Sequence, residues 1–518
     1  MSEALDFNAL VTPARDGQTL LQPAPGQYLS LLEKNRRLLD SYRFDVLDVN
    51  VQDLRRRLRA DLVGRADEPV IGTGHQPEFI HPGVWAKHVV TQRLAERAGA
   101  RAFHLVVDND VPKKTTFTVP SHKSDYVETH EVGFGPYRAG WAFEQLPALS
   151  RQELEQIGDD VRRAMGHGFD ETLMPMFLEA AGSVAQPRDF VEQLIAGRGA
   201  IDRKFGAEMM EHRVSEVWGG PLLALMICDA ERFVQCYNAA LADYRREQGI
   251  RGTQRPVPDL LCRADRVELP VWTYDRQEAR QRLFVVRGRG KITLVAGADR
   301  MGDVAIDDLD RVETALPAIR NATTRALRPR ALSLTTWARL LGCDVFIHGI
   351  GGAKYDRITD RLVQRYFGVD LPGMICVSAT LRLPLPRFDV GQDDLDRARR
   401  RQRDLAYNPQ RYLEDDSASL VADLIRQRHE AVLRSDHLRD HDWSNHVARR
   451  ETFGQIHRLN GELLGTAPDL PERFAQRVEQ VGRRLASNRL ADSREYFVGL
   501  FRPERLAGLA DGLRAEVG

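Results

Sequence analysis

Hydrophobic and polar positions in the first 150 residues change from helical to strand-like spacing and back. Leucine pairs at helical spacing in residues 28–42 and an Arg-rich helical stretch at 51–62 predict a helical lead-in over residues 1–65. Next come a β-prone run, a loop rich in Gly and Pro, a helical stretch and a second β-prone run, at residues 69–73, 74–83, 84–98 and 102–107. Strand, loop, helix and strand make one βαβ unit, so residues 66–150 are predicted to form the first half of a parallel-sheet core.

The pattern between residues 151 and 386 is interrupted and then resumes. Residues 151–255 have mostly helical spacing and predict a helical insertion. Antiparallel strands are predicted by the β-prone runs at residues 269–274, 282–286 and 291–295. A second βα unit follows, with a strand, a glycine-rich turn, a helix and a β-like run at residues 344–348, 349–352, 355–367 and 374–377. Residues 256–386 are therefore predicted to complete a Rossmann-like α/β sheet, whose ligand crevice lies beyond the carboxyl ends of the strands.

Residues 387–518 are almost wholly helical and polar in pattern. Phe474, Val478, Val481 and Leu485 form a narrow apolar stripe over two helical turns. This stripe predicts a helical or coiled-coil region that self-associates into a homodimer. The alternative is that the same stripe packs on the rest of the chain.

The overall composition is that of an ordinary soluble protein. The 518 residues include 74 basic and 74 acidic side chains, so no net field attracts the chain to a membrane surface or to nucleic acid, and we expect neither as a partner. Of the basic residues 66 are arginine, which fits a GC-rich coding bias at least as well as phosphate binding. Five widely spaced cysteines without a CxxC pair argue against a disulfide framework and a structural zinc site. The N-terminus has no leader pattern and no apolar run is long enough to span a bilayer, so we expect a cytoplasmic protein.

The first candidate site is the loop from Gly72 to Gly83, between a predicted strand and a predicted helix. Glycines and a helix N-terminus suit an anion such as phosphate, and an imidazole can donate to charge that develops on a leaving phosphate. His75 and His81 are the candidate catalytic residues here; the alternative is that backbone carbonyls satisfy both loop histidines. The candidate nucleotide- or substrate-binding residues of this region are Gly74, Gln76, Gly83 and Lys87.

Asp108 and Asp110 follow the neighbouring predicted strand and are further catalytic candidates. Their carboxylates can hold an amine, a ribose or a divalent ion shared with phosphates. Capping of the next turn is the alternative. His75, His81 and the two aspartates can also be interpreted as metal ligands, but no HxH or HExxH spacing supports that reading, and no protein-held metal is expected.

The third candidate follows the predicted strand at 344–348 and is again glycine-rich. It is neither a P-loop nor a GxGxxG motif, so its interest lies in its position at a strand end. Close packing of helix on strand is the alternative reason for the glycines. The candidate binding residues are His348, Gly349, Gly351, Gly352, Lys354 and Tyr355, with Ser378 and Thr380 after the next strand.

Together these motifs resemble the bacillithiol biosynthesis cysteine-adding enzymes, a family of cysteine ligases that join cysteine to glucosaminyl-malate. The matching segments are Gly74-His-Gln76, Pro82-Gly83 with Trp85, Phe103 to Asp110, Leu327-Arg-Pro329, Gly349-Ile-Gly-Gly352 with Tyr355, and Val377-Ser-Ala-Thr380. The resemblance implies a nucleotidyltransferase-type core, a connecting-peptide insertion and a C-terminal coiled coil that dimerises. His81-Pro-Gly83 is also similar to the HxGH element of class I nucleotidyltransferases, with Val84 in place of its last histidine.

The sequence departs from the family pattern at three points. His75 stands in place of a glutamine, the acidic cluster is Asp-Asn-Asp, and Gly352 is nearest to an absent glutamate. The first hypothesis is a ligase, for example of thiol biosynthesis, that joins an amino acid such as cysteine or a similar carboxylate to a small-molecule amine. It does so either through an adenylate formed from ATP with Mg²⁺ or from an already activated donor. The second is a non-catalytic scaffold that binds a nucleotide or metabolite and acts through its helical tail. A metal-dependent hydrolase is the third.

Overall fold

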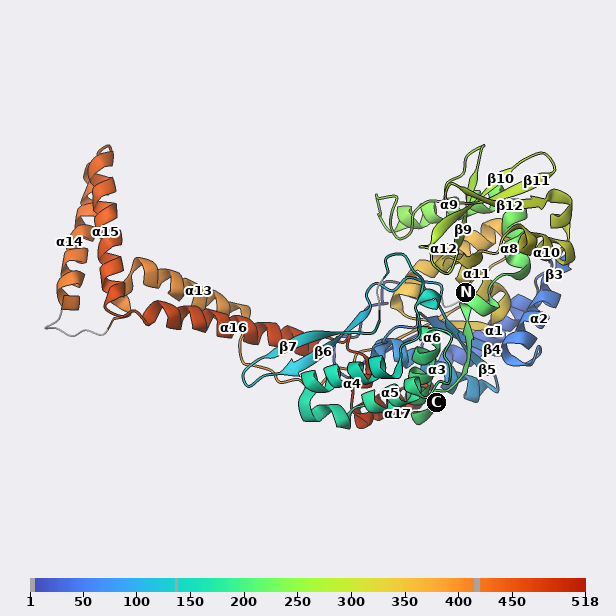
Figure 1. The fold of residues 1–518 in the computed structure, drawn as a ribbon, viewed down its shortest axis with the longest axis horizontal. Coiled ribbons are helices and arrows are strands. Elements are labelled where there is room, and N and C mark those ends of the chain that lie inside the picture. Colours follow the sequence, from blue (N-terminus) through green and yellow to red (C-terminus); the bar gives the residue numbers. More distant parts are fainter. Residues whose placement is uncertain (1–4, 136–137, 414–419) are drawn as a thin grey trace. The chain divides into compact units, whose positions relative to one another are not determined.

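The computed structural model describes residues 5–135, 138–413 and 420–518 (Figure 1). The chain is mixed α/β and divides into two compact units. The first unit comprises the described parts of Met1–Val119, His130–Leu383 and Arg494–Gly518. The second comprises Pro120–Thr129 and the described parts of Pro384–Ser493.

A six-stranded sheet forms the centre of the first unit, in the order β1-β15-β14-β4-β5-β8. Its strands are β1 (Thr19–Gln22), β4 (Val70–His75), β5 (Arg101–Val106), β8 (Met210–Arg213), β14 (Val345–His348) and β15 (Ile375–Ala379). All neighbouring pairs are parallel except β1 with β15. Numbered along the chain, the five parallel strands run 3-2-1-4-5, which is the order of doubly wound sheets.

Alternate residues of the central strands pack on opposite faces of this sheet. Phe103 and Leu105 of β5 belong to a large core cluster, together with residues of α1 (Tyr28–Asp40) and α2 (Val51–Val63). His104 points to the other face, where its ring lies 4.7 Å from that of His88 in α3 (Pro82–Ala98). A Cβ on Gly72 would lie 2.7 Å from the Phe103 ring, so glycine is required there for β4 and β5 to pack.

The second sheet of this unit is antiparallel, in the order β12-β11-β10-β9-β13. Its strands are β9 (Val267–Tyr274), β10 (Gln281–Arg287), β11 (Lys291–Ala296), β12 (Asp299–Ala305) and β13 (Ala326–Pro329). The three antiparallel strands predicted from the sequence are confirmed. α11 (Ala331–Trp337) follows β13, and α12 (Ile350–Phe367) follows β14.

The segment predicted as a helical insertion is mainly helical but also supplies a strand of the central sheet. Its longer helices are α4 (Arg151–Met165), α5 (Met174–Gly182), α6 (Phe190–Lys204), α8 (Gly220–Cys228) and α9 (Ala230–Glu247). Between α6 and α8, β8 pairs with β5 in parallel. Its sequence, Met-Glu-His-Arg, has one apolar residue. It therefore shows neither the continuous apolar run nor the alternation of apolar and polar residues that predicts a strand. The lead-in likewise supplies β1 in addition to its two helices.

The second unit is helical apart from parts of the β6–β7 hairpin (Thr116–His122 and Val127–Gly133). Its longer helices are α13 (Gln392–Tyr407), α14 (Leu420–His441), α15 (His446–Gly465) and α16 (Leu470–Asp492), and α14 and α15 form a hairpin (Figure 1). The predicted apolar stripe lies on α16, which packs along α13. Val481 is buried, and the ring of Phe474 contacts that of Tyr412. The stripe therefore packs within one chain, while self-association stays a prediction.

The last 25 residues rejoin the first unit. α17 (Pro503–Val517) contacts α3, and the ring of Phe497 packs against that of Phe79. The sequence had placed all of residues 387–518 in one region. None of the described helices combines the length and the apolarity needed to cross a membrane.

Candidate functional site

A cavity of about 430 Å³ lies at the carboxyl ends of three neighbouring strands, β4, β5 and β14. His75 at the end of β4, Asp110 after β5 and His348 at the end of β14 all line it. The two glycine-bearing turns predicted to share a crevice therefore each contribute a histidine to one cavity. The order of the parallel strands reverses between β4 and β14, and such a reversal is where doubly wound sheets bind ligands.

The opposite wall of the cavity comes from the antiparallel sheet. The guanidiniums of Arg280 and Arg330 lie 4.7 Å and 4.1 Å from the ring centroid of Trp272. Arg280 also donates to Asp110 Oδ1 at 2.9 Å, and Gln76 Nε2 donates to Asp110 Oδ2 at 3.0 Å. The Asp110 carboxylate thus links Gln76, which follows β4, to Arg280 of the antiparallel sheet. Arg280 and Arg330 both lie beside the ring of Trp272.

His75 presents a neutral imidazole at the cavity. Its Nδ1 lies 3.1 Å from the carbonyl oxygen of Gln76, and a carbonyl only accepts, so Nδ1 carries the proton and Nε2 is an acceptor. Burial, and next the charge of Lys87, lower the pKa of His75 well below its ordinary value. The side chain is therefore unprotonated at neutral pH and can accept a proton.

His348 is fixed by a buried ion-pair network. Its Nε2 lies 3.1 Å from Asp356 Oδ2, and Asp356 in turn receives Arg339 at 2.6 Å. The Arg339 and His348 charges hold the pKa of Asp356 below its usual range despite burial. An ionised carboxylate only accepts, so Nε2 of His348 carries a proton and donates it to Asp356.

Asn109 adds a polar atom that has no partner. Its Nδ2 donates to the carbonyl of Pro329 at 2.8 Å, and the residue is 3% exposed. Its Oδ1 accepts no hydrogen bond from any of the residues that the structure describes. A buried amide oxygen left unpaired is costly, and Asn109 is among the residues that line the cavity.

Lys87 lies beneath the end of β4. Its Nζ donates to the carbonyl of Gly74 at 2.7 Å, and the residue is 3% exposed. Within the described part of the chain it has no carboxylate partner, and burial lowers its pKa to about 7. Lys87 supports the backbone of the cavity wall, whereas the prediction had it bind the ligand. Gly74 itself lines the cavity, and a Cβ there would crowd Leu105 at 3.1 Å.

Asp108 is not part of the lining of this cavity, although it is two residues from Asp110. Its carboxylate accepts from Arg213 Nε at 2.8 Å and from the backbone and hydroxyl of Ser215 at 2.9 and 2.5 Å. Burial raises the pKa of Asp108, with Glu144 adding to the effect. These contacts fix Asp108 against β8, and its predicted catalytic role stays a prediction.

His81, Gly83, Ser378 and Thr380 form a separate group. His81 is the N-cap of α3, where its Nδ1 accepts from Gly83 N at 3.1 Å, and burial lowers its pKa to about 4. Arg494 donates to the hydroxyls of Ser378 and Thr380 at 3.1 and 3.3 Å. A Cβ on Gly83 would lie 2.5 Å from the Ala379 carbonyl. The capping and packing alternatives account for these residues, because α3 begins against β15 and not against the cavity.

The remaining predicted residues lie at the start of α12 and outside the cavity lining: Gly349, Gly351, Gly352, Lys354 and Tyr355. Gly351 and Gly352 are exposed, and so is Tyr355. A Cβ on Gly352 would lie 2.8 Å from His348 Nδ1. Glycine there therefore leaves room for the imidazole, which is a packing reason for part of the motif.

The sequence did not single out Asn109, Trp272, Arg280 and Arg330 as site residues. Asn109 stands between the two predicted aspartates, and Arg330 follows an Arg-Pro stretch that the family resemblance had marked. Arg280 had no such signal, because 66 arginines spread over the chain conceal those that line a cavity.

The described residues contain no group of three or more His, Cys, Asp or Glu side chains arranged to hold a metal ion. His75, His81 and the two aspartates, considered as metal ligands from the sequence, are thus dispersed over three sites. No protein-family model matches the chain, and no curated protein matches it significantly.

Proposed function

We propose that the cavity at the ends of β4, β5 and β14 is the active site of a ligase that joins an amino acid or similar carboxylate to an amine. The observation that supports it best is the pair of histidines, His75 and His348, on the two strands between which the sheet order reverses. Doubly wound sheets bind nucleotides and related ligands at this point. The resemblance to nucleotidyltransferase-type cysteine ligases rests on the same turns.

The polar groups of the cavity include donors for an anionic substrate, an acceptor for the amine and an acceptor for the proton that the amine loses. Arg280 and Arg330 are paired with Asp110 and Glu268 and both stack on Trp272, and their remaining N–H groups can donate to an anionic substrate. The unpaired Asn109 Oδ1 can accept from the incoming amine. His75, with Nε2 as an acceptor, can take the proton that the amine loses.

In the proposed reaction a carboxylate oxygen first bonds to the α- or γ-phosphorus of ATP, the bond from that phosphorus to pyrophosphate or to ADP breaks, and the acyl adenylate or acyl phosphate formed carries AMP or phosphate as its leaving group. The amine nitrogen then bonds to the carbonyl carbon, the bond to the leaving group breaks, and His75 accepts the amine proton. Binding of both reactants in one cavity raises the reaction rate because it orients the amine toward the activated carbonyl carbon. The donor set does not fit a protein-held Mg²⁺, because Asp110 is the one carboxylate among the described lining residues and both its oxygens have partners.

That last observation also favours the second candidate function, a site that binds a nucleotide or metabolite without turnover. A ligase usually positions the metal that accompanies ATP, and the engagement of Asp110 by Gln76 and Arg280 opposes this. The two functions differ in one measurable property, which is release of AMP or ADP.

The test combines binding and turnover on the full chain. ATP binding is measured by calorimetry for the wild type, for His75→Ala and for Asn109→Leu, with His167→Ala as the control because His167 is exposed outside the cavity. We expect about tenfold weaker binding in the two cavity variants and an unchanged constant in the control. Release of AMP or ADP with a mixture of amino acids and amines supports the ligase, and binding without release supports the second function. Equal ATP affinity in all four proteins would refute a nucleotide site in this cavity.

A further inference from the structure

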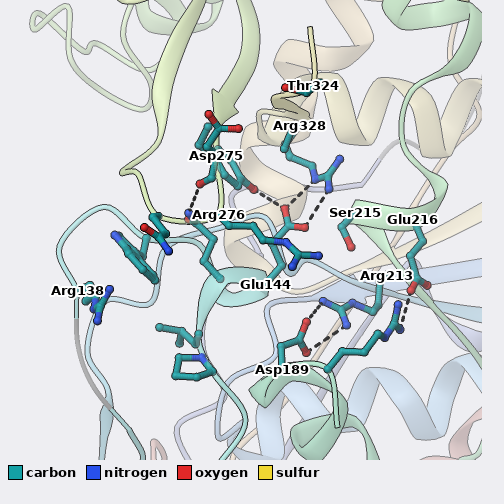
Figure 2. Close-up of a pocket in the computed structure, with 18 residues that line it drawn as sticks. Arg138, Glu144, Asp189, Arg213, Ser215, Glu216, Asp275, Arg276, Thr324 and Arg328 are labelled. Atoms are coloured by element: carbon teal, nitrogen blue, oxygen red, sulfur yellow. Dashed lines mark hydrogen bonds and ion pairs between the residues drawn. The ribbon is translucent and has the colours of Figure 1, made fainter. Parts of the chain in front are cut away.

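A second and larger cavity, of about 860 Å³, lies in the first unit (Figure 2). Its wall comes from the carboxyl end of β8, the turn between β9 and β10, the start of β13, and the loops before α4 and α6. Five arginines and four carboxylates line it, with Ser215, Thr324 and Tyr274. Its volume is in the upper part of the range for small-molecule sites.

Two of the arginines are fixed by ion pairs, one of them buried and the other half-buried. Arg213 contacts Asp189 at 2.6 Å and Asp108 at 2.8 Å, and its side chain is 7% exposed. Arg328 makes a two-pronged contact with Glu144, at 2.7 and 2.9 Å. Figure 2 shows both arginines facing the same space from different elements. The carboxylates hold the guanidiniums in place, so their orientation does not depend on a ligand.

The charge that remains unpaired in this cavity is positive. Each of the four lining carboxylates has an arginine within ion-pair distance: Glu144 with Arg328, Asp189 with Arg213, Glu216 with Arg188, and Asp275 with Arg325. Among the described residues, by contrast, Arg138 and Arg276 of the lining form no ion pair with a carboxylate. Their guanidiniums offer up to ten N–H donors at the cavity.

We propose that this cavity is a binding site for an organic anion with two or more negative groups, either phosphates or carboxylates. Arg138 and Arg276 would bind the charged groups, and Thr324 also lines the cavity. Guanidinium pairs favour oxyanions because their planar donors match carboxylate and phosphate geometry. An inorganic ion alone would leave most of the 860 Å³ unfilled. The proposal does not depend on the ligase function, because it requires binding only.

The binding experiment uses the full chain and three probes: fructose 1,6-bisphosphate, citrate, and uncharged glucose, at constant ionic strength. The test variant is the double substitution Arg138→Gln with Arg276→Gln, and the matched control is Arg289→Gln, an exposed arginine in the next turn of the same sheet. We expect saturable binding of at least one anion, no binding of glucose, and about tenfold weaker binding in the double variant alone. Binding of the bisphosphate alone or of citrate alone identifies phosphate or carboxylate as the recognised group.

A second measurement uses the wild type and does not depend on the folding of a variant. Phenylglyoxal modifies accessible arginines, and mass spectrometry reads the rate at each site. The bound anion should slow modification of Arg276 at least severalfold and leave Arg289 unchanged. Unsaturable binding of both anions, equal affinity in the double variant, or equal modification with and without anion would each overturn the proposal. His75→Ala should bind the anion normally, so a failed ligase hypothesis and a failed anion site give different results.

Discussion

Replacement of Lys87 by methionine tests whether a neutral lysine supports the wall of the first cavity. Lys87 is 3% exposed and donates to the Gly74 carbonyl, and burial lowers its pKa from 10.5 to about 7. At 1.36 kcal/mol per pKa unit, this shift corresponds to a cost of about 5 kcal/mol in the free energy of folding when the buried Lys87 amine is protonated, that is, at low pH. Methionine keeps the length of the side chain and removes the charge, at the cost of one hydrogen bond of about 1 kcal/mol.

The sign of the pH dependence follows from the lowered pKa. Between pH 7 and 10.5 the unfolded chain binds a proton on this lysine that the folded chain does not, so the stability of the wild type rises with pH across this window. The penalty is complete below about pH 7 and absent above 10.5. Lys87→Met should therefore be more stable than the wild type at pH 7, by about 4 kcal/mol, and slightly less stable near pH 10.5.

The direct assay is NMR of ¹³Cε-labelled lysine, which is practical because the chain has only eight lysines. One resonance should titrate with a midpoint near pH 7 and be missing from Lys87→Met. Thermal unfolding at pH 7 and pH 10 then compares the variant with the wild type and with Lys204→Met, an exposed control. Eight lysines that all titrate above pH 9, or a low-pH resonance that persists in the variant, would refute the reasoning.

Three other predictions follow from the packing. Arg213→Ala leaves two buried carboxylates without their cation and should lower the free energy of unfolding by about 3–5 kcal/mol, measured by denaturant titration of the first unit. A chain that ends at Ser493 lacks α17 and should expose core surface, detected as increased binding of the dye ANS; a compact chain without dye binding would contradict the assignment of the last 25 residues to the first unit. If the protein forms dimers, Trp443→Glu with Phe453→Glu, which changes side chains 60% and 61% exposed on the α14–α15 hairpin, should shift sedimentation to the monomer without loss of helicity. Val481→Glu, in the buried stripe, should instead unfold the second unit.

Much of the fold could be predicted from sequence because its central strands are apolar and its turns carry glycine. β4, β5, β14 and β15 are mostly buried on both faces and appear as short β-prone runs with few charged residues, which is close to the pattern of a parallel sheet. β8 and β1 escaped prediction because they lie at the two edges of the sheet and are short. Edge strands are specified by the register of their neighbours more than by their own hydrophobicity.

The position of the candidate site in the fold could be predicted from the sequence, but only some of the residues that line it could. The location follows from the strand ends, since parallel strands bring the residues after them to one edge. Which side chain faces the cavity depends on local geometry that composition does not encode. His81 caps α3 while His75, six residues earlier, lines the cavity, and both stand in the same glycine-rich loop.

The Asp108-Asn109-Asp110 segment shows why an acidic motif was misleading as a single site. Asp108 binds Arg213, which lines the larger cavity, and Asp110 binds Arg280, which lines the smaller one. Asn109 between them donates to the backbone of β13. Three successive side chains thus anchor the end of β5 to β8, to β13 and to the turn before β10, and two of them hold an arginine that lines one of the cavities. The arginines neutralise the negative charge at the end of β5, so the polar groups that remain for a ligand are the two histidines in the smaller cavity and Arg138 and Arg276 in the larger one.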